Sequence, residues 1–405
     1  MQRICEMSIE KQNSLPLSGI RVLEFVHMVM GPACGLMLAD LGAEVIKIEP
    51  IPQGDNTRRL MGSGAGYWMT YNRNKKSLSV DIKTEKGMNL VKELIATADI
   101  VIENFRPGAM KKLGLDYEGV KAIKPDIIYG SMKGFLPGPY EHRTALDEVV
   151  QMMTGLAYMT GPVGRPLRAG ASVNDVMGGM FCAYSILAAL YQRQLTGEGQ
   201  FVETGLFENS AFLVAQHMMQ RAVTEQPVAP MPNRVSAWAV YDVFNTQGNE
   251  QVFIGVVTDS QWVAFCEAFD LNGLKNNPDY ALNNQRVKAR DVILPIIRDA
   301  LGALKKSKVM ELCEEAGLPF SPIQRPEDLF HDNHLNQSGG MGELKLENGK
   351  QVKVPLLPFT MNGHRFGVRE NVPQVGENTV EVLTSLGYDA AEVQHLTETD
   401  IIKCS

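Results

Sequence analysis

The sequence predicts an α/β protein with a mostly parallel sheet, and three observations indicate this class. Short apolar and β-branched runs alternate with helical patterns between residues 20 and 131. Parallel strands need crossover connections of this kind, whereas antiparallel strands can be joined by short turns. The chain has 405 residues, of which 44% are hydrophobic and 21% are charged, the balance of a folded globular protein. This length exceeds one ordinary core, so we expect two domains.

The first half of the chain consists of repeated strand–helix–strand units. Ile20 to Phe25 is an apolar, β-branched run that predicts a strand. Pro32 suits the first turn of the next helix, and Gly42 suits its end. The remaining predicted elements are strands at 43–49, 80–82, 100–102 and 126–131, and an amphipathic helix at 84–98.

The second half begins with a long helix and then changes character. This helix follows Asn174-Asp175 and runs to about Gln194, with Gly197 as a stop signal, and a strand follows in QFVETGLF. Two Pro-rich segments, EQPVAPMPNRVSAW and GLPFSPIQRPEDL, then enclose the strands WAVYDVF and EQVFIGVV and several helices. A hairpin that turns at Asn348-Gly349 and a helical tail complete the chain.

Composition argues against several classes of function. The formal net charge of −7 disfavours non-specific binding to nucleic acid or to anionic membranes. The N-terminus carries charges of both signs and no apolar core, so we interpret it as a loose leader and not as a signal peptide. The longest apolar run, around 180–190, is interrupted and shorter than a membrane span. Six scattered cysteines without a CxxC pattern favour reduced thiols in a cytoplasmic protein.

The motifs of common cofactor and metal sites are missing from the sequence. The first βα turn reads EFVHMVMGPACG, with bulky residues where a dinucleotide fingerprint needs glycines, and no P-loop pattern occurs. His331 and His334 have a spacing compatible with a metal, but they lie in a polar stretch where no third ligand can be assigned. We therefore predict no metal site and no tightly bound cofactor.

Three basic stretches flank successive predicted strands, where the ligands of open α/β sheets bind. They are NTRRL, with Arg58; NRNKKSLSVDIK, with Arg73, Lys75 and Lys83; and NFRPGAMKKLG, with Lys112. Each cation taken alone is better explained as a solvated surface charge. Taken as a set in an acidic protein, they favour a phosphate-bearing ligand.

Asp175 is a candidate for both a structural and a catalytic role. Asp and Asn are preferred helix N-caps, and Asn174-Asp175 directly precede the helical pattern, so the residues alone support capping at least as well as catalysis. The two roles are compatible, because a helix N-terminus favours the ionised carboxylate that attack on an acyl group requires. Gly178-Gly179 cost roughly 1 kcal/mol each relative to Ala, which indicates close approach by another helix or by a ligand.

Ordered segments along the chain resemble the class III CoA-transferases, also called the CaiB–BaiF or formyl-CoA transferase family. The similarity runs from about Leu17 to about Ile402. The similar segments are LSGIRVLEF, GPACGLMLADLGAEVIKIEP, the GD-TR pattern at 54–58, NRNKKSLSVDIKTEKG, ADIVIENFRPGAMKKLGL, GSMKGF, SVNDVMGGMFCAYSILAALYQRQLTGEGQ and GLPFSPI.

The resemblance implies a Rossmann-like large domain with a parallel sheet, built from both ends of the chain, and a smaller inserted α+β domain. The expected N-terminal part of the large domain is 1–224, and the inserted domain with its linker is 225–325. The return segment and the C-terminal part of the large domain are 326–405. Two chains of this family interlock like links, so we expect an interlocked homodimer.

The resemblance also implies a mechanism in which Asp175 is the nucleophile. The aspartate attacks the donor acyl-CoA to give a mixed anhydride, and the released thiolate attacks Asp175 to give an aspartyl-CoA thioester. The acceptor carboxylate repeats these steps in reverse, so coenzyme A is part of the substrate and neither ATP nor metal is needed. We expect Gly178-Gly179 to make room for the thioester and backbone N–H groups near the helix start to stabilise the oxyanions.

Contacts to CoA carry over from the family to positions on several loops. Lys83 and Lys112 are cations that can meet CoA phosphates. Pro50 stands where some members have an arginine beside the adenine, and MPNRVSAW replaces the glycine-rich flap of formyl-CoA transferases, which disfavours formyl-CoA as donor. The implied contacts are His27, Met28, Val29, Val80, Lys83, Asn104, Phe105, Lys112 and Lys133.

The substrates implied are a short acyl-CoA and a small carboxylic acid. The segment NRVSAWAVYDVF is similar to that of members acting on small dicarboxylates such as succinate, mesaconate, itaconate or malate. The expected donor is succinyl-CoA or another dicarboxylyl-CoA. Arg234 and Arg168 are candidates for pairing with the second carboxylate, and a surface charge is the alternative for each.

Two other functions are weighed against CoA transfer. An α-methylacyl-CoA racemase of the same superfamily would use a histidine in a GHD-type segment together with the equivalent aspartate. The segment here reads RTALDEVVQ, and His142 is out of register. Because the acid–base partner is missing, the racemase is the less favoured alternative. A catalytically silent CoA-binding protein is a third interpretation, which the intact VNDVMGG disfavours.

Overall fold

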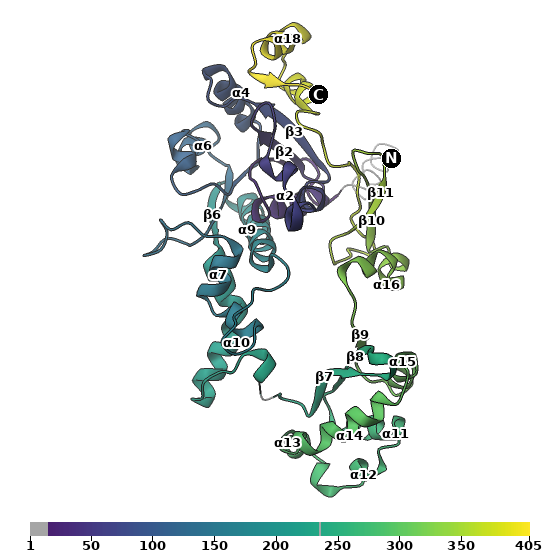
Figure 1. Cartoon of the computed structure of the whole chain (residues 1–405). Coiled ribbons are helices and arrows are strands. Elements are labelled where there is room, and N and C mark those ends of the chain that lie inside the picture. The colour runs from purple at the N-terminus through teal and green to yellow at the C-terminus, as the bar shows by residue number, and fades with distance from the viewer. Residues whose placement is uncertain (1–14, 235) are drawn as a thin grey trace, which may run out of the picture. The chain divides into compact units, whose positions relative to one another are not determined.

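The computed structural model describes residues 15–234 and 236–405 (Figure 1). The chain divides into two compact units, Met1–Pro232 with His334–Ser405, and Asn233–Asn333. The chain thus leaves the large unit after residue 232 and returns to it at residue 334, where the sequence predicted 224 and 326. The expected leader falls in residues 1–14 and lies outside the described residues.

The large unit contains a seven-stranded sheet with the order β12-β3-β2-β1-β4-β5-β6. Its strands pair in parallel, except that β12 pairs antiparallel with β3 at one edge (Figure 1). The order 3-2-1-4-5-6 is that of dinucleotide-binding folds, and it reverses between β1 and β4, where ligands of such sheets bind. The strands are β1 Arg21–Phe25, β2 Glu44–Glu49, β3 Lys75–Val80, β4 Ile100–Glu103, β5 Ile128–Lys133, β6 Gln200–Gly205 and β12 Ile402–Lys403.

Both faces of this sheet are buried, because successive strand residues point to opposite sides. In β1, Leu23 and Phe25 belong to the apolar cluster on one face, and Val22 belongs to the cluster on the other. The first face is covered mainly by α4 (Glu85–Ala96), α17 (Thr379–Ser385) and α18 (Ala390–Glu398). The second face is covered by α2 (Met30–Asp40) and α9 (Val173–Thr196).

One predicted strand is displaced in the structure. The sequence predicted residues 80–82, whereas β3 begins at Lys75 and ends at Val80. The error arises because Lys75 and Lys76 look like loop cations, yet Lys75 pairs with buried Glu24. The remaining elements of this unit are η1 (Asn56–Arg59), α3 (Tyr67–Tyr71), α5 (Ala109–Lys112), α6 (Tyr117–Ile123), α7 (Asp147–Met153), α8 (Leu156–Thr160), α10 (Leu206–Thr224), α16 (Asn333–Gln337), β10 (Met341–Lys345) and β11 (Gln351–Pro355).

Helix α9 ends where the sequence predicted. Gly197 adopts a left-handed backbone (φ 76°) directly after Thr196 and caps the helix. By length and composition alone, α9 could span a membrane. An 18-residue stretch of it has a mean hydropathy of 1.4, and 44% of that stretch is buried. Helix α9 packs against α2, β5 and β6, so its apolar character is that of a core helix.

The small unit is an α+β domain with its own core. An antiparallel sheet with the order β7-β8-β9 packs against helices around Trp262, Phe265 and Ile297. Its elements are β7 (Val240–Asn245), β8 (Gln251–Val256), α11 (Asp259–Ala268), α12 (Asn272–Lys275), α13 (Asn283–Lys288), α14 (Arg290–Gly302), α15 (Lys306–Glu315) and β9 (Phe320–Pro322).

Candidate active site

Asp175 lies in the first turn of α9, which begins at Val173 after the N-cap residue Ser172. Burial and the nearby carboxylate of Asp147 raise the pKa of Asp175 to about 7, and Arg168 acts in the opposite direction. Two expectations are therefore corrected. Asp175 is not the N-cap, and its place in the helix does not hold its pKa at the ordinary value of an aspartate, because desolvation and a like charge raise it.

Asp147, the first residue of α7, provides the cap that Asp175 does not. Its Oδ2 accepts hydrogen bonds from the backbone N–H groups of Asn174 (2.8 Å) and Asp175 (3.3 Å). Its Oδ1 accepts a hydrogen bond from the Gln151 amide and lies 3.5 Å from Arg168 Nη2. These two N–H groups are among the unpaired donors that open a helix. Because Asp147 occupies them, they are not the free oxyanion donors that we expected.

Gly178 and Gly179 make room for helix α2. A Cβ on Gly178 would lie 2.5 Å from Met30 Cε, and a Cβ on Gly179 would lie 2.5 Å from Met30 O. Both distances are shorter than a real side chain tolerates. The sequence left two explanations open, and the structure supports close approach by another helix. We also expected these glycines to make room for a thioester, but α2 occupies that space.

The loops after β1 and β4 meet at the switch point of the sheet. His27 N donates to Asn104 Oδ1, and Asn104 Nδ2 donates to His27 O, both at 2.9 Å. The His27 and Phe105 rings stack with their centroids 5.3 Å apart, and burial is the main cause that lowers the pKa of His27. A pocket of about 420 Å³ opens here, and its lining includes His27, Met28, Ile48, Pro50, Asp55, Phe105 and Arg106.

Other predicted CoA contacts lie outside this pocket lining, and Asn104, which pairs with His27, is one of them. Val29 is the buried N-cap of α2, and Val80 is buried at the end of β3. Lys83 and Lys112 are exposed. Their contacts with CoA stay predictions that rest on the family resemblance.

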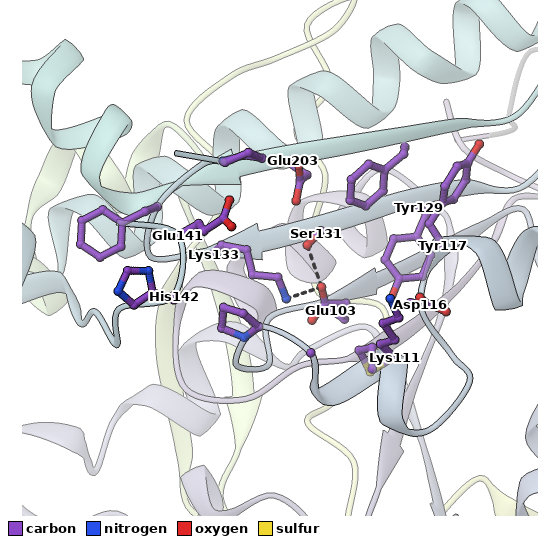
Figure 2. Close-up of a pocket in the computed structure, with 16 residues that line it drawn as sticks. Glu103, Lys111, Asp116, Tyr117, Tyr129, Ser131, Lys133, Glu141, His142 and Glu203 are labelled. Atoms are coloured by element: carbon purple, nitrogen blue, oxygen red, sulfur yellow. Dashed lines mark hydrogen bonds and ion pairs between the residues drawn. The ribbon is translucent and has the colours of Figure 1, made fainter. Parts of the chain in front are cut away.

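Lys133 lies in a second pocket, of about 330 Å³, at the ends of β4, β5 and β6 (Figure 2). Its Nζ lies 2.5 Å from Glu103 Oε1 and donates to the carbonyl oxygen of Phe105 at 2.8 Å. Ser131 donates to the same Glu103 oxygen at 2.7 Å, and His142 also lines the pocket. Glu103 offsets the charge of Lys133, and the contact of Lys133 with CoA stays a prediction that rests on the family resemblance.

Several cations of the first two basic stretches stabilise the large unit. Arg73 Nη2 lies 2.7 Å from Asp40 Oδ2, and Lys75 Nζ lies 2.9 Å from Glu24 Oε2; all four side chains are buried. Arg58 likewise pairs with a buried carboxylate at 2.5 Å. Arg73 and Lys75 are therefore not the solvated surface charges that we expected of single cations, and buried carboxylates offset the charge of all three. Sequence alone does not show which strand-end cations have buried partners.

Sequence reasoning missed the roles of Asp147 and Thr57 around the predicted site residues. Asp147 and Gln151 are spaced as neighbours on one helix face, a pattern that could have drawn attention to them. Thr57 stands inside the GD-TR pattern, and its hydroxyl accepts a hydrogen bond from Met28 N at 2.9 Å. The part of the chain that the structure describes contains no group of three or more His, Cys, Asp or Glu side chains able to hold a metal ion.

The sequence comparisons match one protein family over most of the chain. The model of CoA-transferase family III matches residues 17–379. Succinate–glutarate CoA-transferase of Agrobacterium fabrum is 32% identical over 92% of this chain and 96% of its own length. Succinyl-CoA:glutarate CoA-transferase of Homo sapiens is 29% identical over 97% and 91%, and the succinyl-CoA–L-malate CoA-transferase alpha subunit of Chloroflexus aurantiacus is 31% identical over 96% and 94%.

Solved structures show the same fold. A CaiB/BaiF family protein from Brucella suis superposes with a TM-score of 0.82 at 30% identity, covering 92% of this chain and all of that one. A protein of Mycobacterium tuberculosis gives a TM-score of 0.79 at 27% identity, covering 91% and 99%.

The chain belongs to CoA-transferase family III. It is an enzyme that transfers CoA, and the family resemblance drawn from the sequence is confirmed. The relatives named here are CoA-transferases, which does not favour the racemase alternative.

Proposed function

We propose that this enzyme moves CoA from succinyl-CoA, or another short dicarboxylyl-CoA, to a carboxylic acid through an aspartyl-CoA thioester at Asp175. The observation that carries the proposal is the half-buried carboxyl group of Asp175, with its pKa raised to about 7, at the start of a core helix. Its substrate class is supported by the relatives that act on succinate, glutarate and malate.

The proposed reaction proceeds by acyl transfers that balance without another reactant. An Asp175 oxygen attacks the thioester carbon of the donor, and the C–S bond breaks to give an aspartyl anhydride and the CoA thiolate. The thiolate attacks the Asp175 carbonyl carbon, so the donor acid leaves and aspartyl-CoA remains. The acceptor carboxylate then forms a new anhydride, and the thiolate attacks its acyl carbon to release product and free Asp175.

The environment of Asp175 suits this role. A carboxylate whose pKa lies near the working pH is more basic, and hence more nucleophilic, than a solvated aspartate with a pKa near about 3.9. Arg168, which lowers the pKa of Asp175, keeps part of the population ionised at neutral pH. One thioester replaces another of similar energy, so the proposal requires no tightly bound cofactor and no metal.

The decisive experiment is mass spectrometry of enzyme incubated with succinyl-CoA. We expect a CoA adduct on the peptide that contains Asp175, cleaved by hydroxylamine and missing in Asp175→Asn. Asp299→Asn, which changes an exposed carboxylate in the small unit, is the matched control and should keep the adduct. Transfer activity without any adduct in the wild type would contradict the aspartyl-CoA pathway.

The acceptor can be found by a screen with succinyl-CoA as donor. Glutarate, malate, itaconate and mesaconate should give the corresponding acyl-CoA thioesters, and monocarboxylates of equal length should react more slowly. A parallel reaction in deuterated water separates transfer from racemisation. Exchange at the α-carbon without CoA transfer would overturn the proposal in favour of the racemase.

We also propose that the enzyme is an interlocked cytoplasmic homodimer. Large apolar side chains are exposed on α9 and α10, including Tyr184 (69%), Leu195 (72%) and Phe212 (69%). Contiguous apolar surface of this kind is typical of an interface, and a second copy is the partner that the family resemblance implies. The cytoplasmic location is supported by free thiols at each described cysteine.

Subunit exchange tests the interlocked form. Two differently tagged preparations should each run as dimers in light scattering, and mixing them should give no mixed dimers until they are unfolded and refolded together. Tyr184→Glu should weaken the dimer because it places a charge on the apolar face, whereas Tyr388→Phe, far along the chain, should not. A wild-type monomer, or rapid exchange between native dimers, would contradict this proposal.

A further inference from the structure

The loop after β1 has its backbone polar groups held by three different side chains. Lys47 Nζ donates to Val26 O at 2.7 Å, and Asn104 pairs with both the N–H and the C=O of His27. Met28 N donates to Thr57 Oγ1 at 2.9 Å. The loop at the switch point is thus fixed from Val26 to Met28, and its side chains face the 420 Å³ pocket that His27 and Met28 line.

Met28 has an uncommon backbone conformation that this arrangement maintains. Its φ is 63°, in the left-handed region that non-glycine residues seldom occupy. Met28 is 40% exposed, and its Sδ lies 3.8 Å from Thr57 Oγ1. Backbone strain of this kind persists only where the surroundings impose it, and it is concentrated at binding and catalytic sites.

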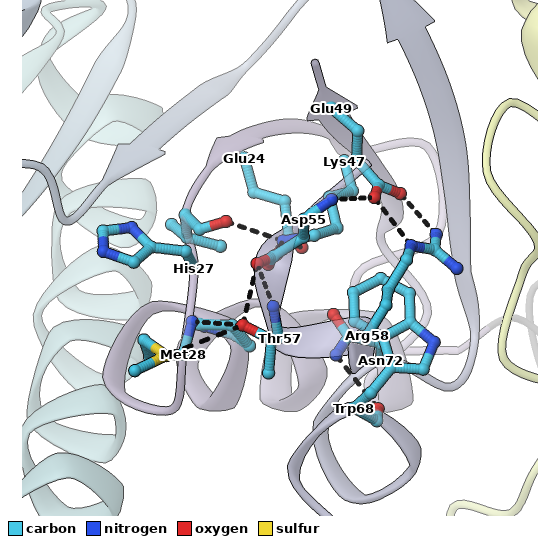
Figure 3. Close-up of polar contacts among 12 residues, drawn as sticks. Glu24, His27, Met28, Lys47, Glu49, Asp55, Thr57, Arg58, Trp68 and Asn72 are labelled. Atoms are coloured by element: carbon cyan, nitrogen blue, oxygen red, sulfur yellow. Dashed lines mark hydrogen bonds and ion pairs between the residues drawn. The ribbon is translucent and has the colours of Figure 1, made fainter. Parts of the chain in front are cut away.

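Thr57 connects Met28 to a buried network of charges (Figure 3). The Thr57 hydroxyl donates to Asp55 Oδ1 at 2.7 Å, and Thr57 N donates to the same oxygen at 2.8 Å. Because the hydroxyl proton is committed to a carboxylate, the oxygen is left to accept the Met28 N–H. Burial alone raises the pKa of Asp55, but Lys47 and the bonds from Thr57 prevail and lower it, so the acceptor is ionised.

Asp55 is in turn fixed by its neighbours. Lys47 Nζ lies 3.1 Å from Asp55 Oδ2, and Asp55 N donates to Glu49 Oε2 at 2.8 Å. Arg58 pairs with Glu49 on the far side and stacks over Trp68 with its guanidinium carbon 3.7 Å from the ring centroid. Figure 3 shows Thr57 between this network and the Met28 backbone. A rigid, ionised carboxylate thus orients one hydroxyl toward the loop.

We propose that Thr57 is a positioning residue for CoA binding: its hydroxyl, oriented by Asp55, holds Met28 in the left-handed conformation that shapes the pocket beside His27 and Phe105. This inference rests on the proposed function, because it takes that pocket as part of the CoA site. Thr57 acts through Met28 and touches no reacting atom.

The test uses Thr57→Val, which keeps the shape of the side chain and removes the hydroxyl. Loss of the bond lets Met28 leave its strained conformation, so the Kd for CoA, measured by titration calorimetry, should rise about tenfold. The KM for the acyl-CoA donor should rise by a similar factor, while kcat and the KM for the acid acceptor change little. Thr57→Ser keeps the hydroxyl and should restore CoA affinity.

The control and the contrary outcomes are distinct. Thr384→Val removes an exposed hydroxyl that donates to Val380 O at 2.8 Å on α17, and it should leave the Kd for CoA unchanged. A Thr57→Val enzyme that binds CoA like the wild type overturns the positioning role and leaves the transferase proposal intact. A fall in kcat with no change in the Kd for CoA, or no rescue by Thr57→Ser, also overturns it. A wild-type enzyme that binds no CoA overturns both proposals.

Discussion

Two carboxylates with different surroundings define the candidate active site at the scale of single residues. Asp147 accepts two backbone N–H bonds and an amide bond and faces Arg168, all of which stabilise an anion. Asp175 is half-buried near Asp147, and desolvation together with the charge of Asp147 opposes its ionisation. Asp147 caps the start of α9, whereas Asp175, in the first turn of that helix, is the nucleophile that we propose.

The pH dependence of transfer should follow the ionisation of Asp175. Attack requires the carboxylate, and the pKa of Asp175 is raised to about 7, so kcat/KM should rise with pH and level off above neutrality. Arg168→Gln removes a cation that lowers this pKa, so the rise of kcat/KM should move to higher pH. If kcat/KM instead rose at about pH 4, where an ordinary aspartate titrates, Asp175 would not be the group whose ionisation controls transfer.

Asp175 should also lower the stability of the folded enzyme above acid pH. An unfolded aspartate titrates near about 3.9 and the folded one near 7, so the unfolded state loses its proton first and stability falls across that interval. Asp175→Asn removes this effect, and its Tm should exceed that of the wild type more at about pH 8 than at about pH 4. Asp299→Asn should show no such pH-dependent gain; an equal gain at both pH values for Asp175→Asn would contradict the prediction.

Residue-scale roles were only partly predictable from the sequence. Asp175, His27 and Asn104 could be named because they stand in recognisable segments at strand or helix ends. The pKa of Asp175 could not be predicted, because it depends on Asp147, which lies on another helix. A local rule, the helix dipole, favoured the ionised form, and the tertiary environment reversed that preference.

At the scale of elements, the contact between α2 and α9 explains both glycines of the VNDVMGG segment. The two helices approach so closely that the Gly179 Cα faces the backbone of Met30 and Cys34. This contact fixes the start of α9, and with it Asp175, against the helix that follows the β1 loop. The loop at His27 and the carboxylate at Asp175 therefore lie at the same end of this helix pair, since His27 precedes Met30 by three residues and Asp175 precedes Gly178 by three.

Gly179→Ala tests this contact. The added Cβ would lie 2.5 Å from Met30 O and 3.0 Å from Ala33 Cβ, so the helices must separate. We expect a loss of about 1–3 kcal/mol in the free energy of unfolding, measured by urea denaturation. Gly302→Ala, in a helix where a Cβ meets nothing within 4 Å, is the control and should be neutral or stabilising. Equal effects of the two substitutions would contradict the packing argument.

Strand β3 shows why one element was displaced in the prediction. Its first residues, Lys75 and Lys76, have low strand preference and high charge, so the local pattern favours a loop. In the fold, Lys75 lies under α2 with Glu24 and the carbonyl oxygen of Pro32 as partners. The partners come from segments more than forty residues away. Buried ion pairs of this kind cannot be read from a single stretch of sequence.

At the scale of the whole molecule, the C-terminal segment completes the sheet that the N-terminal segment begins. Strand β12 pairs Ile402 with Val80, and the yellow end of the chain in Figure 1 lies beside β3. Thr379 Oγ1 donates to Lys403 O at 2.8 Å, which fastens the tail to α17. The large unit is therefore complete only when the chain has returned from the small one.

Deleting residues 401–405 tests this closure. Ile401 and Ile402 are 6% and 2% exposed, so their loss removes two buried side chains worth about 1.5–3 kcal/mol each. We expect a lower Tm in calorimetry and weaker CoA affinity, because β3 lies in the sheet that carries the site. Deleting only Cys404 and Ser405 should have little effect. If the longer deletion leaves the Tm unchanged, β12 is dispensable.

The sequence by itself determined the fold class, the family and the segment that carries Asp175. The alternation of apolar strands and amphipathic helices is a local, periodic signal, and so are Pro32, Gly42 and Gly197 at helix ends. The tertiary structure alone decided which charges are buried in pairs, that Asp147 caps α9, that α2 fills the space beside Gly178-Gly179, and that Thr57 holds Met28. Each of these depends on side chains that are distant in the chain and meet only after the sheet has formed, because desolvation and hydrogen-bond partners are set by neighbours in space.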